Sequence, residues 1–304
     1  MDFKAELGQR IQTLREEKGL SRQAVCGIED ILTTRQLQRI EKGQSLPTIA
    51  TAMYIAAQLE VSLDSLANNE SLELPEGYVT LKYRLNKLFH YGNEERLQQR
   101  EAIIEEIYEK YFDNLPEEEQ IAIQVQQASL DMINTNDINY DQGLLEEYLH
   151  QVILKEQLTL NDIEILNLRL LSLGLKNFNK EEFIDLLSKV LLAASYFPFN
   201  DLEAIQSTII SAAGILSYYE EYDLLPDILE VLEEVMSKRN DFQDKIFSYA
   251  LQWKIALFIK HNYREAEENY RRVNMLIDLL TEDVLKENMQ LDWEQDQIRF
   301  KQRQ

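Results

Sequence analysis

The feature that most constrains the fold is a regular succession of amphipathic stretches, with few residues that could interrupt them. From residue 78 onward, apolar residues recur at helical spacing in eleven stretches that short polar breaks separate. Only 9 glycines and 5 prolines occur in 304 residues, well below their usual shares of roughly 7% and 5%. We therefore predict an all-α chain built from long helices.

These stretches indicate a helical-repeat architecture. Two successive helices span about 40 residues, close to the length of known two-helix repeats. Tyr263, Ala266 and Tyr270 have the spacing of a second tetratricopeptide helix, in which the small residue allows close helix approach. We expect a right-handed α-solenoid of tetratricopeptide-like helix pairs, whose concave face suits an extended peptide or a partner helix. The expected helices lie near 79–90, 94–113, 116–134, 142–156, 160–175, 180–195, 200–220, 223–238, 242–261, 264–280 and 282–300.

Charge divides the chain into two parts. The whole chain carries 31 basic and 54 acidic residues, a net charge of −23. Residues 1–66 hold eight basic and nine acidic residues, so their net charge is −1 and the remaining −22 falls on the rest. The second part would be repelled by a phosphate backbone, so only the first can approach a polyanion. We predict domains at 1–66 and 78–304, joined by the polar linker 67–77.

Several classes of function are disfavoured by the residues present. Cys26 is the only cysteine and the three histidines are far apart in sequence, so no zinc centre is expected. The glycine-rich phosphate loop, the dinucleotide fingerprint and the nucleophile-elbow pattern are absent. We therefore expect no enzyme activity, no cofactor and no metal. Because no apolar run of about 18 residues occurs, we expect a cytoplasmic protein without membrane association.

The first 66 residues predict a compact domain of five short helices. Leu7, Ile11 and Leu14 form the apolar stripe of a first helix that ends near Gly19. The third helix, RQLQRIEK, directs Leu37 and Ile40 to the core and presents a set of hydrogen-bond donors on its other side. The predicted first residues or caps of helices two to five are Ser21, Thr33 or Thr34, Thr48 and Ser62.

The order of these segments resembles the helix-turn-helix family of Xre/Cro type. The resemblance is carried by LREEKGLSRQAV at 14–25, RQLQRIEKG at 35–43 and LPTIATAMYIAAQLEVSLDSL at 46–66. It implies that the third helix enters the major groove of DNA, with Arg35 and Gln38 at base edges. It also implies a structural ion pair between Arg10 and Glu41, while we expect Arg15 to be solvated surface. The expected DNA-binding residues are Arg22, Gln23, Thr33, Thr34, Arg35, Gln36, Gln38, Arg39 and Lys42, for which an ordinary charged helix face is the alternative interpretation.

Together the two parts resemble the Rgg and ComR group of regulators within the RRNPP superfamily. The resemblance rests on chain length, domain order and the runs TTRQLQRIEKGQSLP at 33–47, AIIEEIYEKYFDNLPEEE at 102–119 and LTLNDIEIL at 158–166, of which the last two are most similar to ComR-like members. The resemblance implies a quorum-sensing transcription regulator, controlled by a short imported signalling peptide bound in the concave face of the repeat domain. It further implies a homodimer that binds double-stranded DNA at an inverted-repeat promoter site, and it leaves open a monomer without peptide.

The same resemblance implies a latch that holds the DNA reader when peptide is absent. Its matching positions are Arg35 and Glu117, and the acidic repeat domain would compete with DNA for this surface. The alternative for Glu117 is a plain helix start, where acidic residues after Pro116 favour the helix dipole. The candidate peptide-binding residues are Arg84, Lys87 and Arg100 for the terminal carboxylate and Asn167 or Gln206 for the backbone, each of which has an ordinary surface role as its alternative.

One other class of function remains open at this stage. A helical-repeat regulator could act mainly by binding a protein partner, with the first domain lending only position. A DNA reader loses affinity steeply as salt is added, whereas a protein-docking module does not. We expect the closing segment DWEQDQIRFKQRQ to cap the last repeat and to contribute to the dimer.

Overall fold

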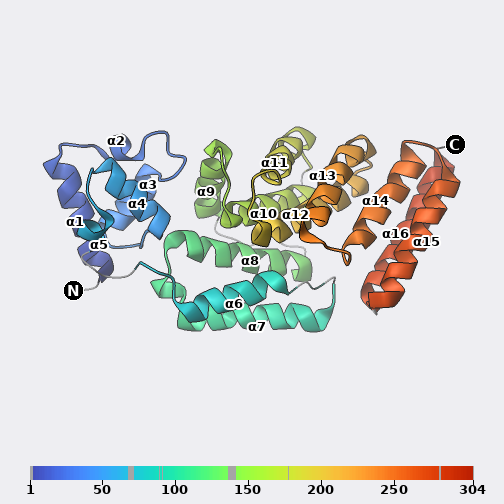
Figure 1. Ribbon diagram of the computed structural model, residues 1–304, viewed down its shortest axis with the longest axis horizontal. Helices are drawn as coiled ribbons and strands as arrows, with labels where there is room; N and C mark the ends of the chain where they lie inside the picture. Colours follow the sequence, from blue (N-terminus) through green and yellow to red (C-terminus); the bar gives the residue numbers. More distant parts are fainter. Residues whose placement is uncertain are drawn as a thin grey trace. The chain divides into compact units, whose positions relative to one another are not determined.

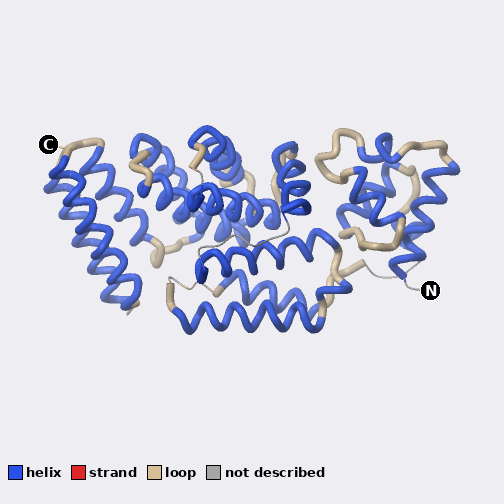
Figure 2. The backbone as a smooth tube through the Cα atoms, turned by 180° about the vertical axis from the view of Figure 1, so that it is seen from behind, coloured by secondary structure: helices blue, strands red, loops and turns tan. Residues whose placement is uncertain are grey.

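The computed structural model describes residues 3–67, 72–88, 90, 92–135, 142–176, 178–280 and 282–303. Within these ranges the chain forms α-helices and short 3-10 helices joined by loops, without any strand (Figure 2). The all-α prediction is therefore confirmed. Two compact units divide the chain: residues 1–88 with 98–165, and residues 89–97 with 166–304.

Five short helices form the N-terminal part of the first unit, as predicted. Three of their N-caps are the expected ones: Ser21 accepts a hydrogen bond from the Ala24 amide, Thr33 from that of Gln36 and Thr48 from that of Thr51. The helices, coloured blue to light blue in Figure 1, are α1 (Phe3–Glu17), α2 (Arg22–Cys26), α3 (Thr34–Glu41), α4 (Ile49–Gln58) and α5 (Leu63–Ala67).

The third helix packs directly on the first. Leu7 and Ile11 of α1 lie in one buried core with Leu37 and Ile40 of α3. Gly8 sits at the crossing, where a Cβ atom would lie 2.1 Å from the carbonyl oxygen of Ile40. Only glycine allows the two backbones to approach this closely.

The rest of the first unit comes from the helices that follow, and α10 runs across the boundary at residue 165. The structure gives α6 (Glu76–Lys87), α7 (Glu94–Lys110), the 3-10 helix η1 (Phe112–Asn114), α8 (Glu117–Thr135), α9 (Gln142–Leu154) and α10 (Leu160–Lys176). Three glutamates, Glu117 to Glu119, occupy the first turn of α8, where the helix dipole favours negative charge.

In the second unit, each helix packs mainly against its neighbours in the chain, as in repeat proteins. Ala266 is fully buried, and the rings of Trp253 and Tyr270 pack edge-on with their centroids 5.8 Å apart, which agrees with the predicted repeat. The elements are α11 (Lys180–Ala193), η2 (Phe199–Asp201), α12 (Leu202–Tyr218), η3 (Tyr222–Leu224), α13 (Leu225–Arg239), α14 (Lys245–Phe258), α15 (Tyr263–Leu280) and α16 (Asp283–Gln302).

The last helix, α16, covers the end of this array. The buried carboxylate of Asp296 accepts hydrogen bonds from the Lys254 ammonium at 2.5 Å and from the indole of Trp253 at 2.8 Å. Lys254 also pairs with Asp292 at 2.8 Å. Within the described residues, the helices α6 to α16 number eleven, and each bound lies within three residues of its predicted position.

Candidate functional site

The third helix begins with a complete capping box. The Thr33 hydroxyl accepts a hydrogen bond from the Gln36 amide at 3.1 Å, and the Gln36 side chain accepts one from the Thr33 amide at 2.8 Å. The Glu29 carboxylate in the preceding loop accepts a hydrogen bond from the Thr34 amide at 3.0 Å. These bonds fix the start of α3 and the direction in which its donor-bearing side chains project.

Arg39 of α3 is held by two carboxylates of the repeat helices. Its guanidinium donates to both oxygens of Glu117 at 2.6 and 2.7 Å, in the two-pronged geometry that gives strong ion pairs. It also donates to Glu147 of α9 at 3.1 and 3.3 Å. Burial alone would lower the pKa of Arg39, but its hydrogen bonds to these carboxylates and their negative charge outweigh burial and the pKa is raised.

Neighbouring side chains extend this contact along α3 and α4. Thr33 donates its hydroxyl hydrogen to Glu147 at 2.8 Å, and the Gln36 and Gln151 amides exchange two hydrogen bonds at 3.1 and 3.3 Å. Thr51 of α4 donates to Glu118 at 2.5 Å. We call Arg39, Thr33, Gln36, Thr51, Glu117, Glu118, Glu147 and Gln151 the latch. Burial raises the pKa of Glu118.

The latch differs from the predicted pair in one respect. Arg35 was the predicted partner of Glu117, but Arg39, one turn further along α3, holds that carboxylate while Arg35 is exposed. Residues four apart on a helix project only about 40° apart, so both face the same general direction. The pairing of Arg35 with Glu117 was therefore wrong by one helical turn.

The structure separates the nine predicted DNA-binding side chains into three sets. The latch covers Thr33, Gln36 and Arg39. Arg22 pairs with a buried carboxylate inside the N-terminal helices. The remaining side chains are exposed or partly exposed and stay available to a partner: Gln23, Thr34, Arg35, Gln38 and Lys42.

An ion cluster around Glu41 corrects two further expectations. The Glu41 side chain is fully buried and pairs with Arg15 at 2.5 Å and Arg22 at 2.7 Å. Arg10, the expected partner of Glu41, instead donates to the carbonyl oxygen of Leu66 at 2.7 Å. Arg15, expected on the solvated surface, is therefore a buried structural residue whose hydrogen bond to Glu41 raises its pKa.

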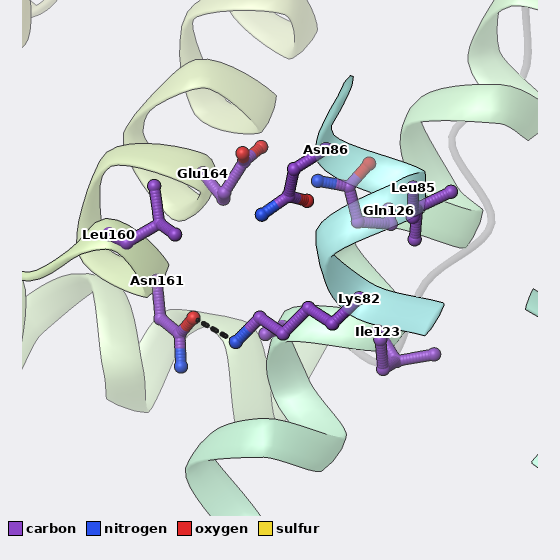
Figure 3. A pocket seen from close by; sticks show the side chains of 9 residues that line it. Lys82, Leu85, Asn86, Ile123, Gln126, Leu160, Asn161 and Glu164 are labelled. Atoms are coloured by element: carbon purple, nitrogen blue, oxygen red, sulfur yellow. Dashed lines mark hydrogen bonds between the residues drawn. The ribbon is translucent and has the colours of Figure 1, made fainter. Parts of the chain in front are cut away.

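The third glutamate of α8 does not join the latch and instead bonds to two residues that line a small pocket, Lys82 and Asn161. Glu119 accepts hydrogen bonds from Lys82 at 2.6 Å, from the Tyr78 hydroxyl at 2.5 Å and from Asn161 at 3.1 Å. Burial opposes ionisation of Glu119, but Lys82 outweighs it and the pKa is lowered. The pocket, drawn in Figure 3, is lined by Lys82, Leu85, Asn86, Ala122, Ile123, Gln126, Leu160, Asn161 and Glu164, from α6, α8 and α10.

Arg100, one of the predicted peptide-binding residues, adjoins this pocket, and three hydrogen bonds already hold its guanidinium. Its guanidinium donates to the carbonyls of Leu85 and Leu88 at 2.7 Å each, which ends α6, and to Gln126 at 2.6 Å. Burial lowers the pKa of Arg100. Arg84 and Lys87 are exposed on α6.

The two predicted amides lie in the second unit. Gln206 is buried and donates to Asp241 and Asp244 at 2.7 Å each, as a structural residue would. Asn167 keeps a buried carbonyl oxygen without a hydrogen bond from the described residues. The five predicted peptide ligands are therefore divided between the two units, with three in the first and two in the second.

Sequence reasoning missed several residues of the latch and of the pocket: Glu147, Gln151, Glu118, Lys82, Asn86, Asn161 and Glu164. Asn161 and Glu164 lie inside the quoted run 158–166, and Glu118 lies inside LPEEE, so the family resemblance marked these segments but not the side chains. No described group of His, Cys, Asp and Glu is arranged to hold a metal ion. No described helix is both long and apolar enough for a membrane span.

Comparisons with known proteins identify both parts of the chain. The family profile of the ComR tetratricopeptide domain matches residues 75–293, and a helix-turn-helix profile matches residues 11–66. No curated protein matches the chain.

Three solved structures illustrate the similarity. ComR from Streptococcus suis is 32% identical, with 97% of this chain and 96% of that chain covered and a TM-score of 0.81. The apo form of the competence regulator ComR from Streptococcus vestibularis is 30% identical, with 97% and 99% covered and a TM-score of 0.84. ComR from S. thermophilus, in complex with DNA and its signalling peptide ComS, is 28% identical, with 95% and 99% covered and a TM-score of 0.67. The chain therefore belongs to the ComR family of helix-turn-helix and tetratricopeptide regulators.

Proposed function

We propose that this chain is a DNA-binding transcriptional regulator that a short signalling peptide switches from a latched to a DNA-binding form. The observation that carries the proposal is the position of Arg39, a donor-rich residue of the third helix, between Glu117 and Glu147. A guanidinium that is paired with two carboxylates cannot pair with a phosphate or a guanine at the same time. The ComR of S. thermophilus was solved with DNA and a signalling peptide, which supports both partners.

The latch competes with DNA for one face of the third helix. It engages Thr33, Gln36 and Arg39, while Arg35 and Lys42 stay exposed. In the DNA-bound form, the nine predicted residues would act together, with Arg35 and Gln38 at base edges and Arg39 released to the duplex. Residues 1–66 would be the reader, 67–77 the linker and 78–304 the peptide-sensing and dimerisation domain.

The pocket gives the peptide a route to the latch. Glu117, Glu118 and Glu119 are consecutive in the first turn of α8, and they reach Arg39, Thr51 and Lys82 respectively. Asn161, which lines the pocket, also binds both Glu119 and the carbonyl oxygen of Glu118. A ligand that displaces Lys82 or Asn161 would move this turn, and with it the two carboxylates of the latch.

The remaining parts of the proposal follow from the family. Two readers would bind the two halves of an inverted-repeat promoter site as a homodimer in the cytoplasm. The chain would perform no catalytic step and would need no cofactor. Among the predicted peptide residues, Arg84, Lys87 and Asn167 keep this role only where the peptide extends beyond the pocket.

The test combines the protein with its own promoter region and with synthetic peptides encoded by small neighbouring reading frames. Mobility shift and mass measurement would report DNA binding and oligomeric state together. We expect one peptide to raise DNA affinity, and the affinity to fall steeply with added salt. If no peptide changes DNA binding, or if binding is insensitive to salt, the regulator that acts through a protein partner would be the better account.

A further inference from the structure

Two side chains of the pocket keep hydrogen-bonding capacity that the described part of the chain does not use. The Asn86 amide forms no hydrogen bond with another residue that the structure describes. Glu164 receives one from Gln126, although a carboxylate can accept about four. Figure 3 shows both side chains, from α6 and α10, extending toward the same space. The pocket therefore presents acceptors on one side and an amide opposite.

The charges around this space already balance. Lys82 is neutralised by Glu119 at 2.6 Å. Among the described residues, Arg100 donates to the neutral oxygens of Leu85, Leu88 and Gln126, and the charge of Glu164 compensates its own. Burial raises the pKa of Glu164, and the neighbouring Arg100 and Lys82 oppose that rise.

A third charge would disturb this balance. A carboxylate from a ligand would meet Glu164, and an ammonium or guanidinium would meet Lys82 and Arg100. Either charge would be a buried excess over the pairs that already balance, which is costly. A neutral donor satisfies Glu164 without adding charge.

We propose that the pocket takes an uncharged hydrogen-bond donor of the signalling peptide: a side-chain amide, a hydroxyl or a ring N–H on an apolar stem. The proposal rests on the peptide-regulated function above. Glu164 accepts the hydrogen, Asn86 accepts or donates beside it, and Leu85, Ile123 and Leu160 surround the stem. This assignment replaces the terminal carboxylate that the sequence analysis placed on Arg100.

The first experiment is a selection from a random heptapeptide library on the full-length protein. Wild type should enrich one position for Asn, Gln, Ser, Thr or Trp. Glu164→Leu should lose this preference and favour aliphatic residues at the same position, while Glu156→Gln, which changes an exposed glutamate outside the pocket, should keep it. Enrichment of Lys, Arg, Asp or Glu there, or one preference shared by all three proteins, would overturn the proposal.

The second experiment measures coupling between the protein and the donor. One selected peptide and its analogue without the donor are titrated against wild type, Glu164→Gln and Asn86→Ala by calorimetry. Removing the donor should weaken peptide binding to wild type about 10- to 100-fold. The same removal should cause a several-fold smaller loss of affinity in either variant. Glu164→Gln keeps the shape of the side chain, so it tests the proposal even if Glu164→Leu fails to fold.

The outcomes separate this inference from the function on which it rests. Equal losses in wild type and both variants would mean that the donor does not meet Glu164 or Asn86, which overturns the inference alone. If no peptide is enriched, or if enriched peptides leave DNA binding unchanged, the peptide-regulated function itself is overturned.

Discussion

The latch makes a quantitative prediction about Glu117→Gln. Arg39 donates two hydrogen bonds to Glu117, and the side chains are 26% and 12% exposed. Hydrogen bonds to charged groups contribute about 1.5–3 kcal/mol of stabilisation. Because Arg39 is partly exposed, we assign this pair about 2 kcal/mol. Because 1.4 kcal/mol corresponds to a factor of ten, the population with a free third helix should rise about 30-fold.

The assay is fluorescence anisotropy of a labelled promoter duplex, titrated with full-length protein without peptide at physiological salt. Glu117→Gln should bind about 30-fold more tightly than wild type, and addition of peptide should narrow the difference. Glu105→Gln removes the same charge from an exposed position on α7, so its effect should stay below about twofold. An equal gain in both variants, or no gain in Glu117→Gln, would refute the reasoning.

Three further predictions concern the reader, the last helix and the pocket. Arg35→Ala should relax discrimination between bases, whereas Lys42→Ala should weaken binding to all duplexes alike and reduce the slope of log affinity against log salt concentration by about one. DNA titrations at several salt concentrations measure this slope. An unchanged slope in Lys42→Ala would exclude a phosphate contact of Lys42. Lys254→Met leaves the buried Asp296 carboxylate without its ammonium, so urea unfolding followed by tryptophan fluorescence should report a loss of about 3 kcal/mol, and a loss below about 1 kcal/mol would contradict this role. Lys82 lowers the pKa of Glu119 despite burial, so the stability from Glu119 is present above its ordinary value of 4.5 and is lost as pH falls through the lower folded value; Glu119→Gln should flatten this part of the unfolding profile, and an identical profile would exclude the contribution.

The sequence predicted the helices well because their signals are local. Apolar periodicity and caps such as Ser21, Thr33 and Thr48 depend on residues within one or two turns, and the observed helices follow them. The resemblance to ComR-like regulators was also confirmed, since family profiles match both parts of the chain in which the runs that carry it lie.

The side-chain partners could not be predicted with the same success, because they depend on the rotation and separation of helices far apart in sequence. Arg35 and Arg39 project about 40° apart, so periodicity cannot choose between them, and the choice falls to the positions of Glu117 and Glu147. Arg100 was assigned to a peptide carboxylate because of its charge. Its actual acceptors are two main-chain carbonyls at the end of α6 and the side chain of Gln126, which no pattern of residue types reveals.

The contact at Gly8 also determines how the reader can be altered. At Gly8, the main chain of the first helix rests directly against the Ile40 carbonyl near the C-terminal end of the third helix. A single added methyl group, as in Gly8→Ala, would therefore push the third helix away and tilt it relative to its own domain. The identity of every proposed DNA-contacting residue would be unchanged. Such a variant would keep all the contact residues but change the direction in which they project toward DNA. Specific binding would then be lost although no residue that contacts DNA had been substituted.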